Sequence, residues 1–354
     1  MTKPIRSQRP SACSVQPSLQ PGSFLATAAT LSLLLTAVFA GQLQAASLLD
    51  PYASANRNPF VEIYGLPAAR SAQQLQQGEL TTALQLEAAN SFTRNSKGGE
   101  SIVIDGESIR SNFQLRLGLS ERWQLGLDIP YLSHDGGNLD SFIDEWHDFF
   151  GLPDGDRPAY PRDQLSFSYQ RGGQSLVDIQ RSSDGLGDVS VSAAYQLSNT
   201  VDRQWSLQGQ LKLPTGDAAQ LLGSESTDLA LALHVTEQGW LAVNGVVLHG
   251  SLGVLWMDGG EVMDELREDW VVYGSSTLAW QFTDNTSLKI QLDGHSAFYD
   301  SELKELGSPS AQLILGGAVR LSEHWLLDLA VSEDIAVDTA PDVVFMIGIK
   351  GGAF

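Results

Sequence analysis

The chain has 354 residues and a formal net charge of -21 at pH 7. This length suits one large domain or two ordinary ones, and so acidic a chain is a poor partner for nucleic acid. After residue 46 no stretch approaches about 18 consecutive apolar residues, which excludes an ordinary membrane-spanning helix.

Residues 1–46 are predicted to be a signal peptide. The segment opens with three basic residues and no acid: Lys3, Arg6 and Arg9. An apolar run at 24–40 is followed by small residues that permit cleavage after about Ala40 or Ala45/Ala46. An N-terminal anchor helix is the alternative, but the run is short and interrupted by Thr and Ser. Cleavage would remove Cys13, the single cysteine, and leave no disulfide or thiolate metal site.

Residues 47–79 are rich in Pro, Asn and Ala, a composition that does not support long regular elements. We expect a loose lead-in segment on the periplasmic side. From residue 80 onward, apolar and polar residues alternate with a period of two, which is the signature of β-strands with one apolar face. Twelve such runs begin near residues 80, 109, 123, 189, 205, 229, 241, 270, 288, 313, 325 and 343.

The connections between these runs alternate in length. Short ones follow the even strands, at 120–122, 198–203, 236–239, 283–286 and 322–324. Longer ones follow the odd strands, at 93–108, 133–185, 214–227, 251–269, 299–310 and 333–342. Short periplasmic turns and longer extracellular loops are typical of outer-membrane barrels. We predict an all-β, up-and-down antiparallel transmembrane barrel of about 12 strands over residues 80–354, with both termini periplasmic. A soluble periplasmic β-protein is the alternative.

Aromatic residues recur beside the short turns, where an aromatic girdle would meet the membrane interface. The candidates are Trp123, Trp205, Trp240, Phe282 and Trp325. Ordinary core tryptophans at strand starts are the alternative.

The apolar phase is expected to face lipid, with Leu117, Leu119, Leu125 and Leu127 as examples from the second and third strands. The opposite phase then lines the lumen, because a soluble core could not absorb so many polar groups. The charged lumen candidates are Arg110, Arg116, Arg122, Asp128, Asp188, Lys212, Asp228, Lys289, Asp293, Arg320 and Asp328. This set is nearly neutral, so the negative excess must lie in the loops.

The loop at 133–185 is far longer than a connector requires, and such loops are usually functional or partly folded. Apolar residues near helical spacing predict a short amphipathic helix that folds over the barrel mouth as a lid: Phe142, Ile143, Trp146, Phe149 and Phe150. A helix on the outer membrane surface is the alternative. Residues 165–180 read as a small hairpin turning at Gly172–Gly173.

Acidic residues crowd 135–163 and 258–269. Two interpretations stay open: a solvated rim that binds divalent cations loosely beside lipopolysaccharide, or a selectivity filter or specific cation site. No metal site is assigned, because "DGD" at 154–156 is too short for a calcium-binding EF-hand loop.

Catalytic chemistry has little support in the sequence. His249 and Ser251 are two residues apart, and some outer-membrane barrels are lipid hydrolases, but no third orienting group is evident. The chain has no G-x-S-x-G, HExxH or phosphate-binding P-loop. We therefore predict that the protein is not an enzyme and has no cofactor.

Four stretches carry a family resemblance: "NPFVEIYGLP" (58–67), "DSFIDEWHDFFGLPDGDRPAYPR" (140–162), "DGLGDV" (184–189) and "LKLPTGD" (211–217). They resemble an uncharacterised, domain-of-unknown-function family of Gram-negative outer-membrane β-barrel proteins. The last two are also similar to barrels of aromatic-degradation transport. The resemblance implies a barrel in the outer membrane and brings no catalytic residues.

The expected function is a pore or uptake protein for small solutes, apolar ones included. The alternatives are a plugged structural or binding barrel without transport, and an outer-membrane lipid hydrolase. The expected partners are outer-membrane lipid, lipopolysaccharide and the barrel-assembly machinery. The last would bind the final strand through Phe354, which is out of phase with Phe345 unless a bulge at Gly351–Gly352 intervenes.

Overall fold

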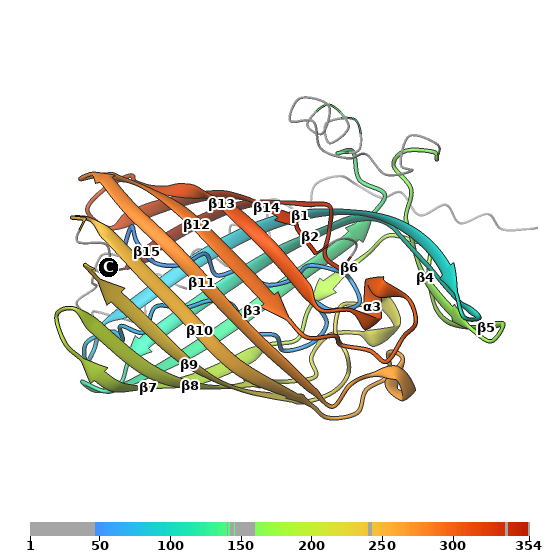
Figure 1. Cartoon of the computed structure of the whole chain (residues 1–354), viewed down its shortest axis with the longest axis horizontal. Coiled ribbons are helices and arrows are strands. Elements are labelled where there is room, and N and C mark those ends of the chain that lie inside the picture. The colour runs from blue at the N-terminus through green and yellow to red at the C-terminus, as the bar shows by residue number, and fades with distance from the viewer. Residues whose placement is uncertain are drawn as a thin grey trace, which may run out of the picture. The chain divides into compact units, whose positions relative to one another are not determined.

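The computed structural model describes residues 47–139, 141, 145, 160–239, 243–336 and 339–352. In that part of the chain, twelve antiparallel strands close into a barrel (Figure 1). They are β1 (Leu80–Lys97), β2 (Glu100–Gly118), β3 (Trp123–Asp135), β7 (Ser190–Asn199), β8 (Arg203–Lys212), β9 (Asp228–Gln238), β10 (Val246–Met257), β11 (Trp270–Thr283), β12 (Thr286–His295), β13 (Ser310–Arg320), β14 (Trp325–Asp334) and β15 (Val343–Gly352). Closure comes from β15 pairing with β1, and from β3 pairing with both β2 and β7. The predicted barrel is confirmed.

The two ends of the barrel differ in their connections. We call the end with the β2–β3, β7–β8, β11–β12 and β13–β14 turns the short-turn end, and the opposite end the long-loop end. The long-loop end carries the helix α3 (Lys304–Gly307) and two 3-10 turns, η3 (Ala218–Gln220) and η4 (Asp264–Leu266). No helix in the described ranges has the length and apolar character needed to cross a membrane.

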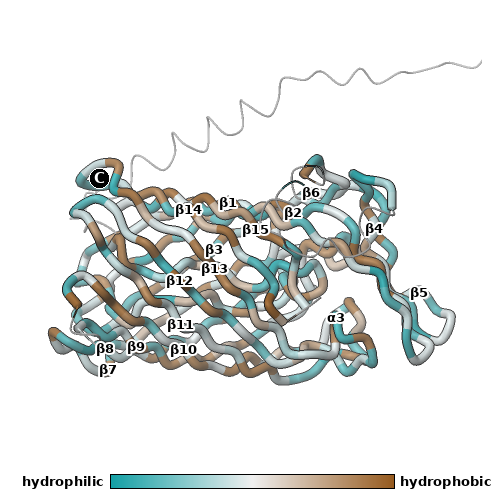
Figure 2. Tube along the Cα trace, turned by 45° about the horizontal axis from the view of Figure 1, so that its top comes forward, coloured by the Kyte–Doolittle hydropathy of each residue, from teal (hydrophilic) through white to brown (hydrophobic). Residues whose placement is uncertain are grey.

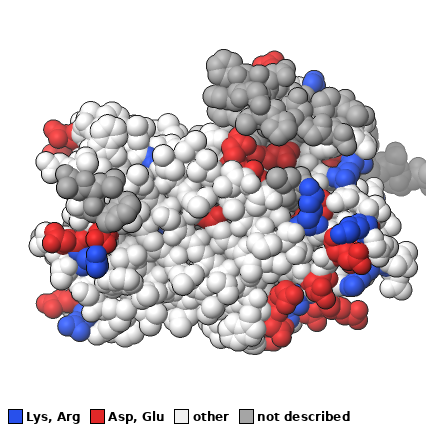
Figure 3. Space-filling view, in the orientation of Figure 1, with Lys and Arg blue, Asp and Glu red and all other residues white. Residues whose placement is uncertain are grey.

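The barrel is apolar outside and polar inside. Leu231, Leu292 and Ile347 stand on the outer surface with 50%, 46% and 48% of their area exposed, while polar side chains of the opposite phase are buried. Leu125 is 40% exposed, so the β2–β3 hairpin follows the same rule. Figure 2 shows apolar and polar residues alternating along the strands. In Figure 3 the charged residues gather at the two ends and leave the middle of this face nearly free of them. An outer surface of this kind is what lipid requires.

One predicted loop is a strand extension. Residues 93–108 were expected to connect two strands, but β1 and β2 stay paired from Leu80 opposite Leu117 to Lys97 opposite Glu100. Beyond the barrel wall, β2 pairs with β4 (Ser166–Arg171), which pairs with β5 (Gln174–Ile179). These strands form a projecting arm (Figure 1). The hairpin predicted at 165–180 is β4 and β5, with positive φ at Gly172 and Gly173.

An apolar cluster covers the long-loop end. It joins the arm, the loops between the strands and a chain segment from inside the barrel. From the arm come Ile102, Ile104, Phe167 and Tyr169, and from the loops Leu221, Met263, Leu266, Phe298, Tyr299, Leu303 and Leu306. We call this cluster the cap.

Candidate functional site: the lumen and its internal segment

Residues 47–79 run through the barrel interior rather than lying beside its periplasmic entrance (Figure 1). The segment has no strand of its own, as its composition predicted. It rises from the short-turn end as an ascending arm (47–57), turns at the long-loop end through an apex (58–66), and returns as a descending arm (67–79). We call the whole of it the internal segment.

The ascending arm is held by hydrogen bonds from inward-facing side chains of the barrel. Gln291 of β12 accepts from the Tyr52 amide at 2.9 Å and donates to the Tyr52 carbonyl at 3.1 Å. Ser287 donates to the Leu48 carbonyl at 2.6 Å. Since a buried amide or carbonyl without a partner is costly, these side chains replace the backbone pairing that an irregular segment lacks.

The descending arm uses the same device on the other side of the lumen. Thr236 of β9 accepts from the Ala72 amide at 2.9 Å, and Gln196 of β7 bonds to both the Ala72 carbonyl and the Gln74 amide at 3.0 Å. Gln124 of β3 accepts from the Leu75 amide at 3.0 Å. Many of the polar side chains that face the barrel interior therefore serve to hydrogen-bond the internal segment.

The apex joins the cap. The Tyr299 hydroxyl donates to the Phe60 carbonyl at 2.7 Å, and the ring of Tyr64 stacks on Phe298 with centroids 5.5 Å apart. Phe60, Val61 and Ile63 are fully or almost fully buried. The "NPFVEIYGLP" stretch thus supplies the central apolar piece of the cap.

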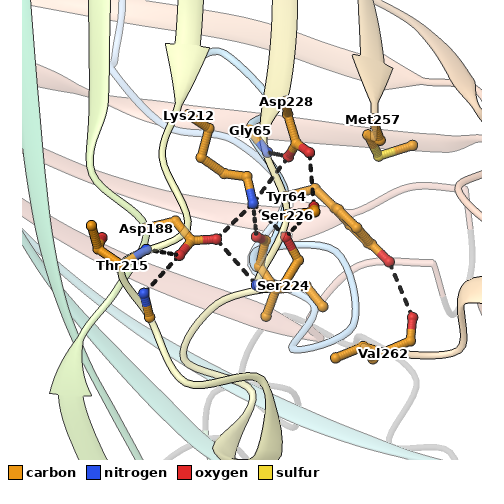
Figure 4. Close-up of polar contacts among 12 residues, drawn as sticks. Tyr64, Gly65, Asp188, Lys212, Thr215, Ser224, Ser226, Asp228, Met257 and Val262 are labelled. Atoms are coloured by element: carbon orange, nitrogen blue, oxygen red, sulfur yellow. Dashed lines mark hydrogen bonds and ion pairs between the residues drawn. The ribbon is translucent and has the colours of Figure 1, made fainter. Parts of the chain in front are cut away.

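A buried charge cluster fixes the apex to the barrel wall (Figure 4). Lys212 of β8 lies between two carboxylates, 2.6 Å from Asp188 Oδ2 and 3.2 Å from Asp228 Oδ2. It also donates to the Ile63 carbonyl at 3.3 Å, and Asp228 accepts from the Gly65 amide at 2.7 Å. We call this group the clamp.

The two short motifs of the family resemblance meet in the clamp. Asp188 of "DGLGDV" accepts from the amides of Thr215 and Gly216 in "LKLPTGD", at 3.0 and 2.7 Å. It also accepts from the Ser224 amide at 3.1 Å, and Thr215 Oγ1 donates to the Gly187 carbonyl at 2.7 Å. These motifs therefore shape a loop and hold the apex.

The other lumen charges are also grouped. Arg57 of the ascending arm pairs with Glu87 at 2.7 Å. Two further clusters each place two cations on one carboxylate. In the first, Arg116 and Arg70 contact Asp128 at 2.8 and 3.3 Å; in the second, Lys289 and Lys350 contact Asp328 at 2.9 and 2.5 Å.

The predicted lumen residues divide into three groups. The buried clusters above contain Arg116, Asp128, Asp188, Lys212, Asp228, Lys289 and Asp328. Arg110 lines an internal cavity, and Asp293 accepts from Gln291 at 2.9 Å. Two candidates lie at the short-turn end instead: Arg122 is exposed and donates to the Tyr195 hydroxyl at 3.1 Å, and the half-buried Arg320 is the last residue of β13. Arg57, Glu62 and Arg70 were missed, because the segment that carries them was assigned outside the barrel.

Two cavities lie along the internal segment. The larger, about 370 Å³, is bordered by both arms and by the barrel wall near the short-turn end. The smaller, about 50 Å³, reaches from there to the clamp. Ala53, Arg70 and Gln114 line both, so the cavities lie end to end. The lining of the smaller cavity is mainly polar, and that of the larger one is about half polar.

The remaining candidates can be placed only in part. Trp123 and Phe282 are each 46% exposed on the outer surface near the short-turn end, and Trp205 and Trp325 are half-buried. Trp240 lies outside the described residues, as do the five lid candidates and Phe354. Among the described residues, no group of three or more His, Cys, Asp or Glu could hold a metal ion.

The pair considered for hydrolysis does not form a catalytic arrangement. His249 bonds to Thr236 Oγ1 and to the Leu49 carbonyl, both at 2.9 Å, and Ser251 bonds to Ser275 at 2.6 Å. Both ring nitrogens of His249 are thus engaged, and one of them anchors the ascending arm.

The fold and lumen define the class: an outer-membrane-type β-barrel, closed by twelve strands and filled by its own N-terminal segment. Residues 28–352 match the family described as "Protein of unknown function (DUF3187)", and the chain belongs to it. No curated protein matches the sequence.

Solved structures support the fold. The COG4313 outer membrane channel from Pseudomonas putida F1 is 13% identical over 80% of this chain and 98% of its own, with a TM-score of 0.52. The NanC porin (7% identity, 76% and 98% coverage) and the Ralstonia pickettii toluene transporter TbuX (9%, 77% and 88%) have TM-scores of 0.42 and 0.36, too low to carry an argument.

Proposed function

We propose that this protein is an outer-membrane channel for small solutes, whose passage runs beside the internal segment. The observation that carries the proposal is the pair of adjacent cavities between the internal segment and the barrel wall. The lipid-compatible outer surface supports a place in a membrane, and the name of the Pseudomonas putida channel supports a conducting role.

The polar lining favours hydrated solutes. Glutamine side chains border the wide cavity, among them Gln73, Gln74, Gln114, Gln124 and Gln208. Such groups can replace the hydration shell of a passing molecule through hydrogen bonds.

The test is conductance and solute flux through the purified full-length mature protein in planar bilayers and vesicles. Three forms are compared: the wild type, a deletion of residues 48–76, and a double variant Ser71→Cys with Thr236→Cys. The hydroxyls of Ser71 and Thr236 that the cysteines replace are 3.3 Å apart, so oxidation would tie the descending arm to β9. Ser71→Cys alone, under the same oxidant, is the matched control.

A conducting wild type supports the proposal, and the deletion is expected to raise conductance several-fold because it empties the lumen. The oxidised double variant should conduct no more than its reduced form. Absence of conductance from the wild type and the deletion overturns the proposal, provided that heat-modifiable gel mobility shows both barrels folded.

A plugged binding barrel is the second candidate. The cap and the many hydrogen bonds that hold the internal segment favour it. It predicts that the wild type does not conduct and that only the deletion does. Sealing by the internal segment would then be its normal state.

A further inference from the structure

The wide cavity has a positive lining. Three cations border it, Arg70, Arg116 and Lys350, against one carboxylate, Asp50. The lumen as a whole contains acids and bases in similar number, so this excess is local. A small molecule that enters from the short-turn end meets this lining.

The excess follows from how the two clusters on this wall are built. Asp128 is shared by Arg70 and Arg116, and Asp328 by Lys289 and Lys350. One carboxylate neutralises one cation, so each cluster keeps a formal charge of about +1. Burial and the neighbouring Arg116 lower the pKa of Arg70 to about 10, which still leaves it charged at neutral pH.

The Asp50 carboxylate adds negative charge near these two clusters but is not bonded to either of them. Its carboxylate makes no hydrogen bond or ion pair with any residue in the described ranges, yet it interacts electrostatically with both Arg70 and Lys289. An acid of the ascending arm thus stands near two under-neutralised clusters and engages neither directly.

The cavity also presents uncommitted hydrogen-bonding groups. Gln114 is 5% exposed and its Nε2 has no hydrogen-bond partner among the described residues, and the buried Oε1 of Gln74 has none there either. Buried polar atoms of this kind are normally satisfied by protein, water or ligand. A donor beside two guanidinium groups favours an anionic ligand with further polar atoms.

We propose that the wide cavity is a binding site for small organic carboxylates, which the positive charges of Arg70, Arg116 and Lys350 attract. In the unliganded protein the Asp50 carboxylate offsets part of that positive charge. A planar guanidinium can bind a carboxylate through two parallel hydrogen bonds. Arg70 suits this ligand, because each of its terminal nitrogens makes one contact, at 3.4 Å to Gln114 and 3.3 Å to Asp128. Arg116 contributes charge, since its terminal nitrogens already donate to Asp128 and to the carbonyls of Leu115 and Leu127. The inference rests on the proposed function for its route of entry, but binding itself can be measured separately.

The experiment compares succinate with its uncharged analogue succinamide. Calorimetry on the detergent-solubilised full mature chain measures binding, and reversal potentials in a salt gradient measure charge selectivity. Asp50→Asn is expected to tighten succinate binding on the order of fivefold, because it removes a nearby like charge. Lys350→Gln and Arg70→Gln should each weaken it about tenfold, while Arg203→Gln, in an exposed pair with Glu237, should leave it unchanged.

Equal binding of succinate and succinamide, or weaker binding by Asp50→Asn, overturns the inference. If Lys350→Gln does not fold, Asp50→Asn still decides, because that change breaks no contact. Conductance without carboxylate preference removes the inference and leaves the channel standing. Succinate binding without conductance removes the channel, keeps the inference and identifies a plugged binding barrel.

Discussion

At the scale of single residues, Lys212 shows how this barrel tolerates buried charge. Its side chain is 2% exposed, and those of Asp188 and Asp228 are 4% and 0% exposed. Burying an ammonium is costly unless partners surround it. Here two carboxylates, a serine hydroxyl and a backbone carbonyl do so, and the result joins the loops at 187–189 and 213–227 to the apex.

Lys212→Met is therefore expected to destabilise the folded barrel by about 3–5 kcal/mol, because two buried carboxylates lose their shared counter-ion. Urea unfolding in detergent or lipid vesicles measures the loss. Arg203→Met is the matched control, since Arg203 and Glu237 form an exposed pair at the short-turn end. Equal effects of the two substitutions would contradict a structural role for the clamp.

Glu62 presents the opposite case. It is 7% exposed, and neither carboxylate oxygen has a hydrogen-bond partner among the described residues. Burial raises its pKa above the usual 4.5, although His134, Arg110 and Arg57 act to lower it and Glu87 adds to the rise. The folded protein therefore holds a proton on Glu62 more tightly than the unfolded chain does.

The linkage has a definite sign. Stability that depends on this proton is complete below pH 4.5 and is lost as the pH rises through the folded-state value. Glu62→Gln should accordingly raise the urea midpoint at pH 8 and leave it unchanged at pH 4. A variant that is less stable than the wild type at pH 8 would mean that the ionised carboxylate has a favourable partner.

At the scale of elements, the internal segment folds without repetitive structure. Its backbone groups bond to Gln, Ser and Thr side chains that project from the barrel wall, and each arm has its own set of strands. The ascending arm bonds to β12, to His249 of β10 and to Glu87 of β1, and the descending arm bonds to β3, β7 and β9. The two arms should consequently loosen independently of each other.

Gln291→Leu removes both hydrogen bonds to Tyr52, and amide hydrogen exchange should accelerate several-fold in residues 48–57 while 68–76 keep wild-type rates. Gln196→Leu is the reciprocal control, and the faster region should then be 68–76. Faster exchange of both arms in either variant would show that the internal segment moves as one unit.

At the scale of the whole molecule, the outer surface decides whether the barrel can sit in lipid. Leu231 lies in the middle of β9, opposite Gly209 of β8 and Val254 of β10, and is 50% exposed. Leu231→Arg should destabilise the barrel by about 2–4 kcal/mol in vesicles, the cost of a cation near the bilayer midplane.

Val201 provides the control for this substitution, because it is 85% exposed in a short turn. Val201→Arg should leave the unfolding midpoint in vesicles unchanged, since a turn at the barrel end meets water. If Leu231→Arg is equally harmless, the apolar belt does not face lipid.

The strand pattern was readable from the sequence wherever lipid enforced it. The extension of β1 and β2 beyond the barrel wall could not be read from the sequence. In β2 the outward residues Ile109 and Phe113 have odd numbers, whereas Ile102 and Ile104 are even-numbered and buried in the cap. The apolar phase changes sides where the strand leaves the barrel, because the arm packs inward on the cap. The alternation therefore breaks, and the strand seemed to begin near 109.

The sequence by itself determined which strand faces meet lipid, because a period of two fixes alternate side chains to opposite sides of a sheet. It also contained the short motifs that build the clamp. Only the tertiary structure decided what fills the lumen. An irregular segment has no periodicity to read, and its partners lie far away in the chain, as Tyr52 and Gln291 do at a separation of 239 residues. Side chains expected to line the lumen, such as Gln124 and Gln291, are hydrogen-bonding partners of that segment.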